Sequence, residues 1–299
     1  MDRFDAMQLF IRIVERRSFT EASNDTGMPR STVSEVIKQM EERLGVQLLQ
    51  RTTRVVRPTL DGEAYYARCL RIISDMEDAE GAFSSIAPKG QLRVEVQGTL
   101  ARYFLIPGLP KFLNTYPDID LSMTERDTWV DLVQEGMDCA LRWGTLPDSD
   151  LIARKLHMAK RLTCASPAYL AKFGTPKTTD ELAGHQVVGM RSLTTGELDP
   201  LEFVGKSENQ TIIRPARVSV SGPESYIEST RQGLGLAQMP FFHIAEDLKA
   251  GRLVSVLDKT PPPSVPISLI YPRNRQLSTR LRVFIDWAVK VFNTADKSS

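Results

Sequence analysis

The first helix of the chain is predicted by apolar residues that recur every three or four positions. These residues are Met7, Phe10, Ile11 and Val14. Their spacing of i, i+3, i+4 and i+7 makes one face of a helix apolar. The basic pair at 16–17 comes next, and cations favour the C-terminal end of a helix because that end carries a partial negative charge. The pattern therefore predicts an amphipathic helix that ends near Arg17.

Two further helices follow, each with signals at its ends. Residues 18–21 (Ser-Phe-Thr-Glu) form a capping box, in which the Ser18 hydroxyl accepts the amide of Glu21, and Gly27 ends this helix. Pro29 suits the first turn of the third helix, since a missing amide costs nothing there, and Gly45 ends it. The third helix carries an apolar stripe of Val33, Val36, Ile37, Met40 and Leu44.

The opposite side of the third helix is polar and basic. It carries Arg30, Ser31, Ser34 and Lys38. Short hydroxyl side chains allow a helix to approach the floor of a DNA groove, and the longer cations extend to bases or phosphates. The same pattern is also typical of a polar face that contacts only water. The pattern alone leaves these two interpretations open.

A fourth helix is predicted after Thr59, which can cap it. Asp61 and Glu63 then lie in the first turn, where acids are favourable. A helix between two domains exposes part of its apolar stripe, so the stripe favours pairing with a second chain, while packing against its own domains is the alternative. The helix is expected to end near residues 88–90. Its stripe comprises Tyr65, Cys69, Ile72, Ile73, Met76, Ala79, Phe83 and Ile86.

From residue 90 onward, short strands alternate with helical segments. Strands are predicted at 91–96, from Ile119, and at 139–141, with helices from Gly98 to Tyr116 and from Trp129 to Gly136. This alternation predicts a parallel sheet covered by helices on both faces. Further strands are predicted at 161–165, 186–190, 201–204, 217–220, 235–240 and 267–271, and further helices at 168–173, 179–183, 224–231, 241–251 and 278–291.

Composition and charge narrow the class of protein. The 299 residues include 41% hydrophobic and 25% charged residues, which fits a globular protein of two or three domains. We expect a cytoplasmic protein, because the sequence shows no apolar run long enough to span a membrane and no export signal. The net charge is only +1, but the segment from Arg43 to Arg57 holds four arginines and no acid. Such a local basic stretch can face phosphate, although a charged surface loop is the commoner explanation.

The cysteines and histidines indicate neither a metal site nor a catalytic site. Cys69, Cys139 and Cys164 are widely spaced, which favours free buried thiols over a redox pair. The three histidines lie far apart without metal-ligand spacing, and no nucleophile or nucleotide-binding motif occurs. We therefore predict no metal, no cofactor and no enzymatic activity.

Several segments of the chain resemble the LysR-type transcriptional regulators. Near the N-terminus these are residues 18–23 (SFTEAS), 31–34 (STVS) with Ile37, 41–54 (EERLGVQLLQRTTR) and 59–62 (TLDG). Looser similarities to that family's effector domain follow in the same order at 105–117, 131–136, 164–170 and 232–240. The resemblance implies an N-terminal all-α winged helix-turn-helix domain, a long linker helix, and a two-lobed α/β sensor with the periplasmic-binding-protein fold.

The resemblance also implies DNA contacts for individual residues. By position, Arg30, Ser31 and Ser34 would contact base edges, and Lys38 would contact bases or the backbone. In the wing, Arg51 and Arg54 would lie beside the minor groove and phosphates.

Three positions depart from the family pattern. Thr26 replaces a usually buried Leu, Leu49 replaces a usual Phe, and Glu35 lies in the base-contacting region. An acid there can accept from a cytosine amine but repels phosphate. The operator sequence therefore cannot be transferred from relatives.

The resemblance implies three domains and two lobes in the last of them. We predict a DNA-binding domain at 1–58, a dimerising linker helix at 59–88 and an effector-binding domain at 89–299. The first lobe would comprise 90–161 with 266–299, and the second lobe 162–265. Two crossovers between lobes create a hinge, and the cleft between them is the expected effector site.

Candidate effector residues follow the carboxyl ends of the predicted strands, where open α/β sheets bind ligands. Trp143 and Phe203 can equally be core residues, and Arg102 and Arg142 can pair with acids. The arginines near these strand ends favour a small carboxylate effector. The candidates are Thr99, Leu100, Arg126, Thr128 and Trp143 in the first lobe, and Phe203 and Gly222 in the second.

Taken together, these patterns predict a sequence-specific DNA-binding transcriptional regulator that a small molecule controls. Its expected partners are a double-stranded DNA operator with inverted symmetry, a second copy in a homodimer or homotetramer, and RNA polymerase. The alternative is a cytoplasmic solute-binding or catalytic α/β protein without DNA recognition. A solute-binding protein needs an export signal, and a catalyst needs neither the polar face of residues 31–38 nor the helical first domain.

Overall fold

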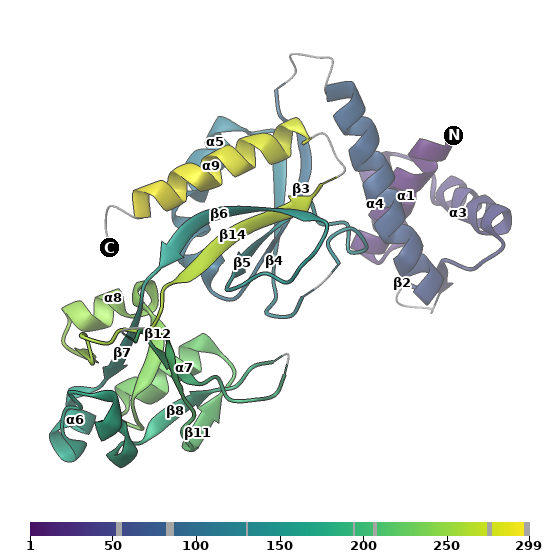
Figure 1. Ribbon diagram of the computed structural model, residues 1–299. Helices are drawn as coiled ribbons and strands as arrows, with labels where there is room; N and C mark the ends of the chain where they lie inside the picture. The colour runs from purple at the N-terminus through teal and green to yellow at the C-terminus, as the bar shows by residue number, and fades with distance from the viewer. Residues whose placement is uncertain are drawn as a thin grey trace.

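The protein consists of a small helical domain, one long helix and a two-lobed α/β part (Figure 1). The computed structural model describes residues 1–51, 56–81, 87–129, 131–193, 195–205, 208–273 and 277–295. In Figure 1 the helical domain and the second lobe lie at opposite ends of the molecule, and the first lobe lies between them.

The helical domain begins with the three helices that the apolar spacing predicts. They are α1 (Arg3–Arg16), α2 (Phe19–Thr26) and α3 (Arg30–Leu44). The Ser18 hydroxyl accepts the amide of Glu21 at 3.2 Å, which confirms that cap. Gly27 and Gly45 end α2 and α3 in the left-handed conformation, with φ of 66° and 71°. Local sequence signals thus define these helix ends.

An apolar core shared by the helices holds this domain together. Phe10 of α1, Ala22 of α2 and Ile37 of α3 are each fully buried in it. The short antiparallel strands β1 (Leu49–Arg51) and β2 (Val56–Pro58) complete the domain and form the wing.

The long helix α4 (Leu60–Gly81) packs on this core at its N-terminal end. The Thr59 hydroxyl accepts the amide of Gly62 at 2.9 Å, which confirms the predicted cap. A Cβ atom at Gly62 would lie 1.9 Å from the carbonyl oxygen of Leu48, so only glycine permits this close approach of helix and wing.

The two ends of the apolar stripe of α4 lie in different surroundings. Cys69 is buried, and the ring of Tyr65 lies 5.5 Å from that of Phe10. Ile72 and Met76 are instead 46% and 45% exposed. The alternative of packing on its own domain therefore holds for the first part of the stripe, whereas Ile72 and Met76 remain uncovered within the chain. The side chain of Ala79, together with Phe83 and Ile86, lies outside the described residues.

The first lobe contains a five-stranded sheet in the order β4-β3-β5-β14-β6. β3 is parallel to β4 and to β5, but β14 is antiparallel to β5 and to β6. The expectation of a parallel sheet is therefore wrong for one strand, β14, which runs opposite to the other four because the chain returns in it from the second lobe. The strands are β3 (Gly90–Val96), β4 (Ile119–Glu125), β5 (Cys139–Trp143), β6 (Leu151–Ala159) and β14 (Val265–Pro272).

Two predicted helices of this lobe differ from the structure. The segment after Gly98 divides into the π-helical turn η1 (Ala101–Leu105), the 3-10 turn η2 (Ile106–Gly108) and α5 (Leu109–Thr115), because prolines interrupt the helical hydrogen bonds. The segment 131–137 forms turns, in which the Asp131 carboxylate accepts the amides of two following residues. The last helix, α9 (Thr279–Ala295), lies over the sheet as predicted (Figure 1).

The second lobe is built around smaller sheets. β12, β7 and β13 form an antiparallel sheet with β7 in the middle, β11 is parallel to β8, and β10 is antiparallel to β9. Its strands are β7 (Arg161–Ala165), β8 (Val187–Met190), β9 (Leu201–Phe203), β10 (Gln210–Ile212), β11 (Ala216–Val220), β12 (Ala237–Pro240) and β13 (Val254–Val256). Its helices are α6 (Pro167–Phe173), the 3-10 helix η3 (Thr179–Gly184), α7 (Pro223–Arg231) and α8 (Phe241–Lys249).

A buried ion pair lies inside the first lobe. Glu95 of β3 contacts Arg142 of β5, and both side chains are almost fully buried. The Arg142 guanidinium also donates to the carbonyl of Thr128 at 3.2 Å and lies 4.9 Å from the ring centroid of Trp129. Burial raises the pKa of Glu95 and lowers that of Arg142. Each charge therefore depends on the other.

Removing one partner of this pair should destabilise the first lobe strongly. Arg142→Ala leaves the Glu95 carboxylate buried without a counter-ion, and we expect the free energy of unfolding to fall by about 3–5 kcal/mol. Urea denaturation measures this change. Arg126→Ala is the matched control, because Arg126 pairs with Glu135 on the surface and should cost no more than about 1 kcal/mol. Equal losses in the two variants would contradict the prediction.

Candidate nucleic-acid interface and effector cavity

The two faces of α3 have opposite surroundings. Val33, Ile37 and Met40 are buried in the core of the helical domain. On the other face, Arg30, Ser31 and Lys38 are exposed and Ser34 is half-buried. In Figure 1, α3 lies on the side of its domain away from the two lobes. The polar face of α3 is therefore accessible to a large partner.

The predicted DNA-contacting residues of α3 share a shallow groove with the wing. Ser31, Ser34 and Lys38 line this groove, which has a volume of about 620 Å³. Gln47, just before β1, and Gln50, within β1, line its other side. The sequence patterns did not indicate these two glutamines, because their relevance depends on the wing folding back beside α3. Amide side chains can both donate to and accept from base edges.

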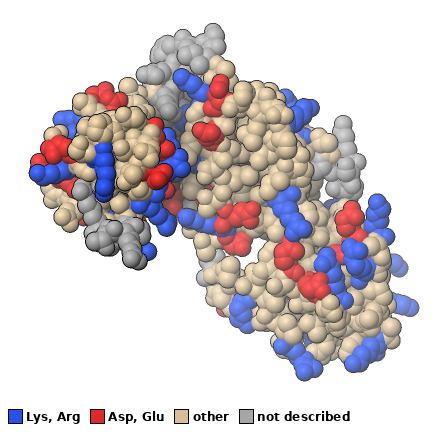
Figure 2. All heavy atoms as spheres, turned by 180° about the vertical axis from the view of Figure 1, so that it is seen from behind, with Lys and Arg blue, Asp and Glu red and all other residues tan. Residues whose placement is uncertain are grey.

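The electrostatic character of this groove is mixed. Lys38 forms an exposed ion pair with Glu42 at 3.7 Å, and Glu35 accepts from the side chain of Gln39 at 3.1 Å. Glu35 also lines the groove. Basic and acidic side chains are interspersed on the face of the molecule seen in Figure 2, in agreement with a net charge of +1. Any preference for DNA therefore depends on local geometry rather than on a general positive field.

The wing arginines are placed only in part. Arg51 is the last residue of β1, at the end of the two-stranded wing. Arg54 lies outside the described residues.

Thr26 and Leu49, which depart from the family pattern, have simple structural consequences. The Thr26 hydroxyl donates to the carbonyl of Ala22 at 2.7 Å, so it is satisfied within α2. Leu49 is 4% exposed and belongs to the core of the helical domain. Neither residue disturbs the helix-turn-helix geometry.

A cavity of about 680 Å³ lies between the two lobes. The first lobe contributes the segment 97–100, which follows β3, and the second contributes the start of α8. The two sides touch where the Thr99 hydroxyl and His243 Nε2 form a hydrogen bond of 2.5 Å. The rings of Tyr103 and Phe242 lie 5.3 Å apart beside it. Movement of one lobe against the other would therefore change the cavity.

Three of the seven predicted effector residues line this cavity. They are Thr99, Leu100 and Trp143. The other four lie outside its lining. Arg126 pairs with Glu135 at 3.2 Å, and Thr128 is exposed. Phe203 is 1% exposed in the core of the second lobe, and Gly222 caps α7 beside the cavity. The candidates that line the cavity therefore come from the ends of β3 and β5, whereas the ends of β4 and β11 line it with Asp127 and Ser221 instead.

The arginines that suggested a carboxylate effector each have an acid partner. Arg142 is buried against Glu95, and Arg126 contacts Glu135. Arg102 contacts Glu224 of α7 at 2.5 Å. These pairs join residues far apart in the sequence, so the sequence pattern could not reveal them. Their charges are already compensated.

Acidic residues outnumber basic residues among the described residues that line the cavity. Two arginines and three acids line it among the described residues: Arg161, Arg191, Asp127, Asp199 and Glu202. Arg161 pairs with Glu202 at 2.6 Å. Burial, followed by the positive charge of Arg102, lowers the pKa of His243 from 6.5 to about 4, so His243 is neutral at pH 7.

Apolar groups make up much of the remaining wall. Trp143 and Phe242 lie edge to face with ring centroids 6.0 Å apart. Met190, Leu193 and Met239 also line the cavity. The cavity thus combines an aromatic and thioether surface with an excess of acidic side chains.

Comparison with known proteins accounts for the order of these parts. Residues 4–63 match the family model described as bacterial regulatory helix-turn-helix protein, lysR family, and residues 86–293 match the LysR substrate binding domain. The chain is 37% identical over 295 residues to the Escherichia coli (strain K12) protein named uncharacterized HTH-type transcriptional regulator YhjC, covering 97% of this chain and 98% of that one. The chain belongs to the LysR family of transcriptional regulators.

Further relatives of this LysR-type regulator include one with a solved structure. CrgA of Neisseria meningitidis (serogroup C, strain 8013) is 35% identical over 289 residues, covering 96% of each chain. The solved structure of Neisseria meningitidis CrgA aligns with a TM-score of 0.62 and 33% identity, covering 96% of this chain and 98% of that one. The full-length structure of the Vibrio cholerae virulence activator AphB aligns with a TM-score of 0.62 and 27% identity, covering 97% and 99%. The regulator thus shares a helix-turn-helix domain and an effector-binding domain with these proteins.

The thiols of the LysR-type regulator are all buried. Cys69, Cys139 and Cys164 are free and lie inside three different cores. Burial raises the pKa of Cys69 to about 11 and that of Cys164 to about 12, and it also raises the pKa of Cys139. These thiols therefore hold little of the reactive thiolate at neutral pH.

Among the described residues, no helix is long and apolar enough to cross a membrane. Over the same residues, no group of three or more His, Cys, Asp and Glu side chains is arranged to hold a metal ion.

Acid should destabilise the regulator partly through His243. Its folded pKa of about 4 lies below the unfolded value of 6.5, so the unfolded state binds the proton first as the pH falls. Stability is therefore lost between pH 6.5 and about 4, by up to about 3 kcal/mol. Urea denaturation at several pH values should show a shallower loss for His243→Gln. An unchanged pH profile in that variant would contradict the prediction.

Proposed function

We propose that this LysR-type regulator contacts base edges through Arg30, Ser31 and Ser34 of α3, and bases or phosphates through Lys38. The observation that carries this proposal is the division of α3 into a buried apolar face and an accessible polar face. A helix held in this way can enter a major groove with its polar side foremost.

The wing would add contacts beside the helix. Arg51 and Arg54 would meet phosphates or the minor groove, as the family pattern implies. We add Gln47 and Gln50 as candidates for base or backbone contacts, because they line the same groove as Ser31 and Ser34. The proposed interface is thus formed by α3 and the wing together.

We further propose that the uncovered part of α4 joins two chains. Ile72 and Met76 are large apolar residues exposed on one helix, and an antiparallel partner helix would cover them. A dimer of this kind presents two α3 helices to an operator with inverted symmetry. The family pattern extends this to a homotetramer that acts on RNA polymerase in the cytoplasm, without catalysis.

The cavity between the lobes is the proposed effector site. Its acidic excess and neutral His243 favour an uncharged or cationic small molecule over the carboxylate that the arginines suggested. Trp143 and Phe242 favour an aromatic or aliphatic body, and a ring of this kind also attracts cations. Binding would shift the lobes relative to each other and so alter the DNA-bound assembly.

Substitutions in α3 should separate sequence-specific from general DNA binding. Ser34→Ala or Arg30→Ala removes a base contact and should cost about 1–3 kcal/mol on the preferred sequence only. Arg51→Ala or Arg54→Ala should weaken binding to all duplexes and flatten its salt dependence. Genome-wide footprinting of the wild-type protein supplies the preferred sequence, and fluorescence anisotropy measures the affinities.

Matched controls come from the sensor surface. Ser122 and Arg126 lie outside the helical domain, so Ser122→Ala and Arg126→Ala should leave both affinities unchanged. If Ser34→Ala and Arg30→Ala both keep the full sequence preference, the proposal that α3 contacts the bases is wrong. Absence of any duplex affinity at low ionic strength would refute the proposed function as a whole.

A ligand panel tests the effector class. Aromatic amines and uncharged aromatic amides should raise the thermal midpoint of the protein, whereas the matching carboxylates should not. Trp143→Ala should weaken binding of the ligands found by about tenfold or more, because it removes an aromatic wall. Phe173→Ala is the matched control, since Phe173 is an exposed aromatic residue outside the cavity. Stabilisation by carboxylates alone would contradict the assignment.

A further inference from the structure

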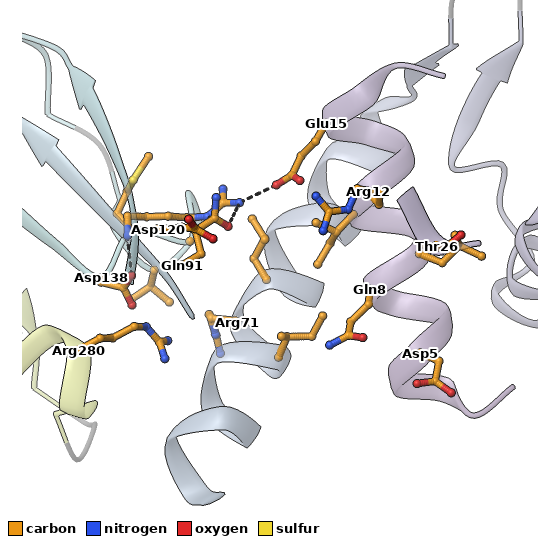
Figure 3. Close-up of a pocket in the computed structure, with 18 of the residues that line it drawn as sticks. Asp5, Gln8, Arg12, Glu15, Thr26, Arg71, Gln91, Asp120, Asp138 and Arg280 are labelled. Carbon is orange, nitrogen blue, oxygen red and sulfur yellow. Dashed lines mark hydrogen bonds and ion pairs between the residues drawn. The ribbon is translucent and has the colours of Figure 1, made fainter. Parts of the chain in front are cut away.

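A polar contact joins the helical domain to the first lobe of the same chain. The guanidinium of Arg93, on β3, donates from Nη2 to Glu15 Oε1 of α1 at 3.1 Å. The same nitrogen lies 3.3 Å from the hydroxyl of Tyr66 on α4, and that hydroxyl donates to Glu15 at 3.2 Å. Figure 3 shows Glu15 pointing from α1 toward the sheet, with a dashed line marking its ion pair with Arg93. We refer to it as the Glu15–Tyr66–Arg93 contact.

The arginine in this contact is held in place by its own lobe. Gln91 Oε1 accepts from Arg93 Nε at 3.1 Å and from Nη2 at 2.7 Å. The Asp138 carboxylate accepts the backbone amide of Arg93 at 2.8 Å. The side chain of Arg93 is only 15% exposed and that of Glu15 30%. A pre-oriented and partly buried pair loses less entropy on forming than a free surface pair.

The rest of this boundary is loosely packed. A cavity of about 510 Å³ separates α1 and α4 from the sheet. Gly136 of the first lobe approaches α4, where an added Cβ would lie 3.6 Å from Leu70. Figure 3 shows Arg71 of α4, and Asp138 and Arg280 of the lobe, on opposite sides of the open space. A boundary divided by a cavity of this size can open at small cost.

The strand that carries Arg93 also leads to the effector cavity. β3 lies between β4 and β5 in the sheet and continues into Gln97, Gly98 and Thr99, which line that cavity. Arg93 and Gln97 are four residues apart, about 13 Å along an extended strand. Displacement of the cavity wall would therefore move the same strand that bears the contact.

We propose that the Glu15–Tyr66–Arg93 contact fixes the orientation of the DNA-binding domain on its own sensor, and that its release weakens DNA binding. This inference rests on the proposed function, because DNA affinity is the property controlled. A restrained domain holds α3 in one orientation, whereas a released domain must be ordered again when it meets the duplex.

Distance measurement tests the contact directly. Nitroxide labels at Asn24→Cys on α2 and Ser122→Cys on β4 report the separation of the two parts, since both positions are exposed and the three native cysteines are buried. In full-length protein whose labelled chains are diluted with an excess of unlabelled protein, so that distances within one chain dominate, the distribution should be single and narrow. Glu15→Gln and Arg93→Gln should broaden it, and the charge-exchanged variant Glu15→Arg with Arg93→Glu should narrow it again. Unchanged distributions in both single variants would overturn the proposal.

DNA affinity then tests the consequence. Glu15→Gln makes the protein more positive, so charge alone predicts tighter binding to a labelled mixed-sequence duplex. Loss of the contact predicts weaker binding instead, by about three- to tenfold. Tyr66→Phe changes no charge and should weaken binding in the same direction. Tighter binding by Glu15→Gln, with Tyr66→Phe unchanged, would overturn the inference.

The controls separate this inference from the proposed function. Arg126→Gln removes a surface arginine of the same lobe that pairs with Glu135, and it should leave the distance distribution as in the wild type. Circular dichroism confirms that each variant is folded. A wild-type protein that binds no duplex would refute the proposed function. If the wild-type protein binds duplex but Glu15→Gln binds more tightly and Tyr66→Phe is unchanged, only the further inference is refuted.

Discussion

The burial of one side of α3 is the constraint on which the rest of the structure depends. Ile37 has no exposed surface, and it packs in the same core as Phe10 of α1 and Cys69 of α4. Rotation of α3 about its axis would bring Ser34 or Lys38 into that core without hydrogen-bond partners, at a cost of several kcal/mol. Because the apolar face must stay in the core, the polar face points outward and is accessible. Three helices from different parts of the first 81 residues fix it in this position.

The helix α4 is the element through which the parts of the molecule meet. Its first turns belong to the core of the helical domain, where Tyr65 packs on Phe10. Tyr66 contacts the sensor strand β3, and Leu70 lies beside Gly136. The next turn carries Ile72 on an uncovered apolar surface. One helix thus contacts the DNA-binding domain and the sensor, and its exposed apolar residues are available to the proposed second chain.

Features set by neighbours in the sequence were predictable, and features set by distant partners were not. The cap at Ser18 and the helix end at Gly27 depend on a few adjacent residues, and both were predicted correctly. The antiparallel return of β14 depends on where the chain re-enters the first lobe, so the strand sequence does not reveal it. The same is true of Arg142, whose partner Glu95 lies 47 residues away, so the sequence could not show that this charge is already paired.

The close approach at Gly62 has a mechanical consequence. Because the backbone of α4 at Gly62 touches the backbone of Leu48, the residue before β1, with no side chain between them, neither can slide past the other without a collision. Any torque applied to α4 must therefore swing β1 and β2 with it. The angle at which the wing meets a duplex would thus depend on the angle between paired α4 helices. A change in that angle would tilt both wings of a dimer at once.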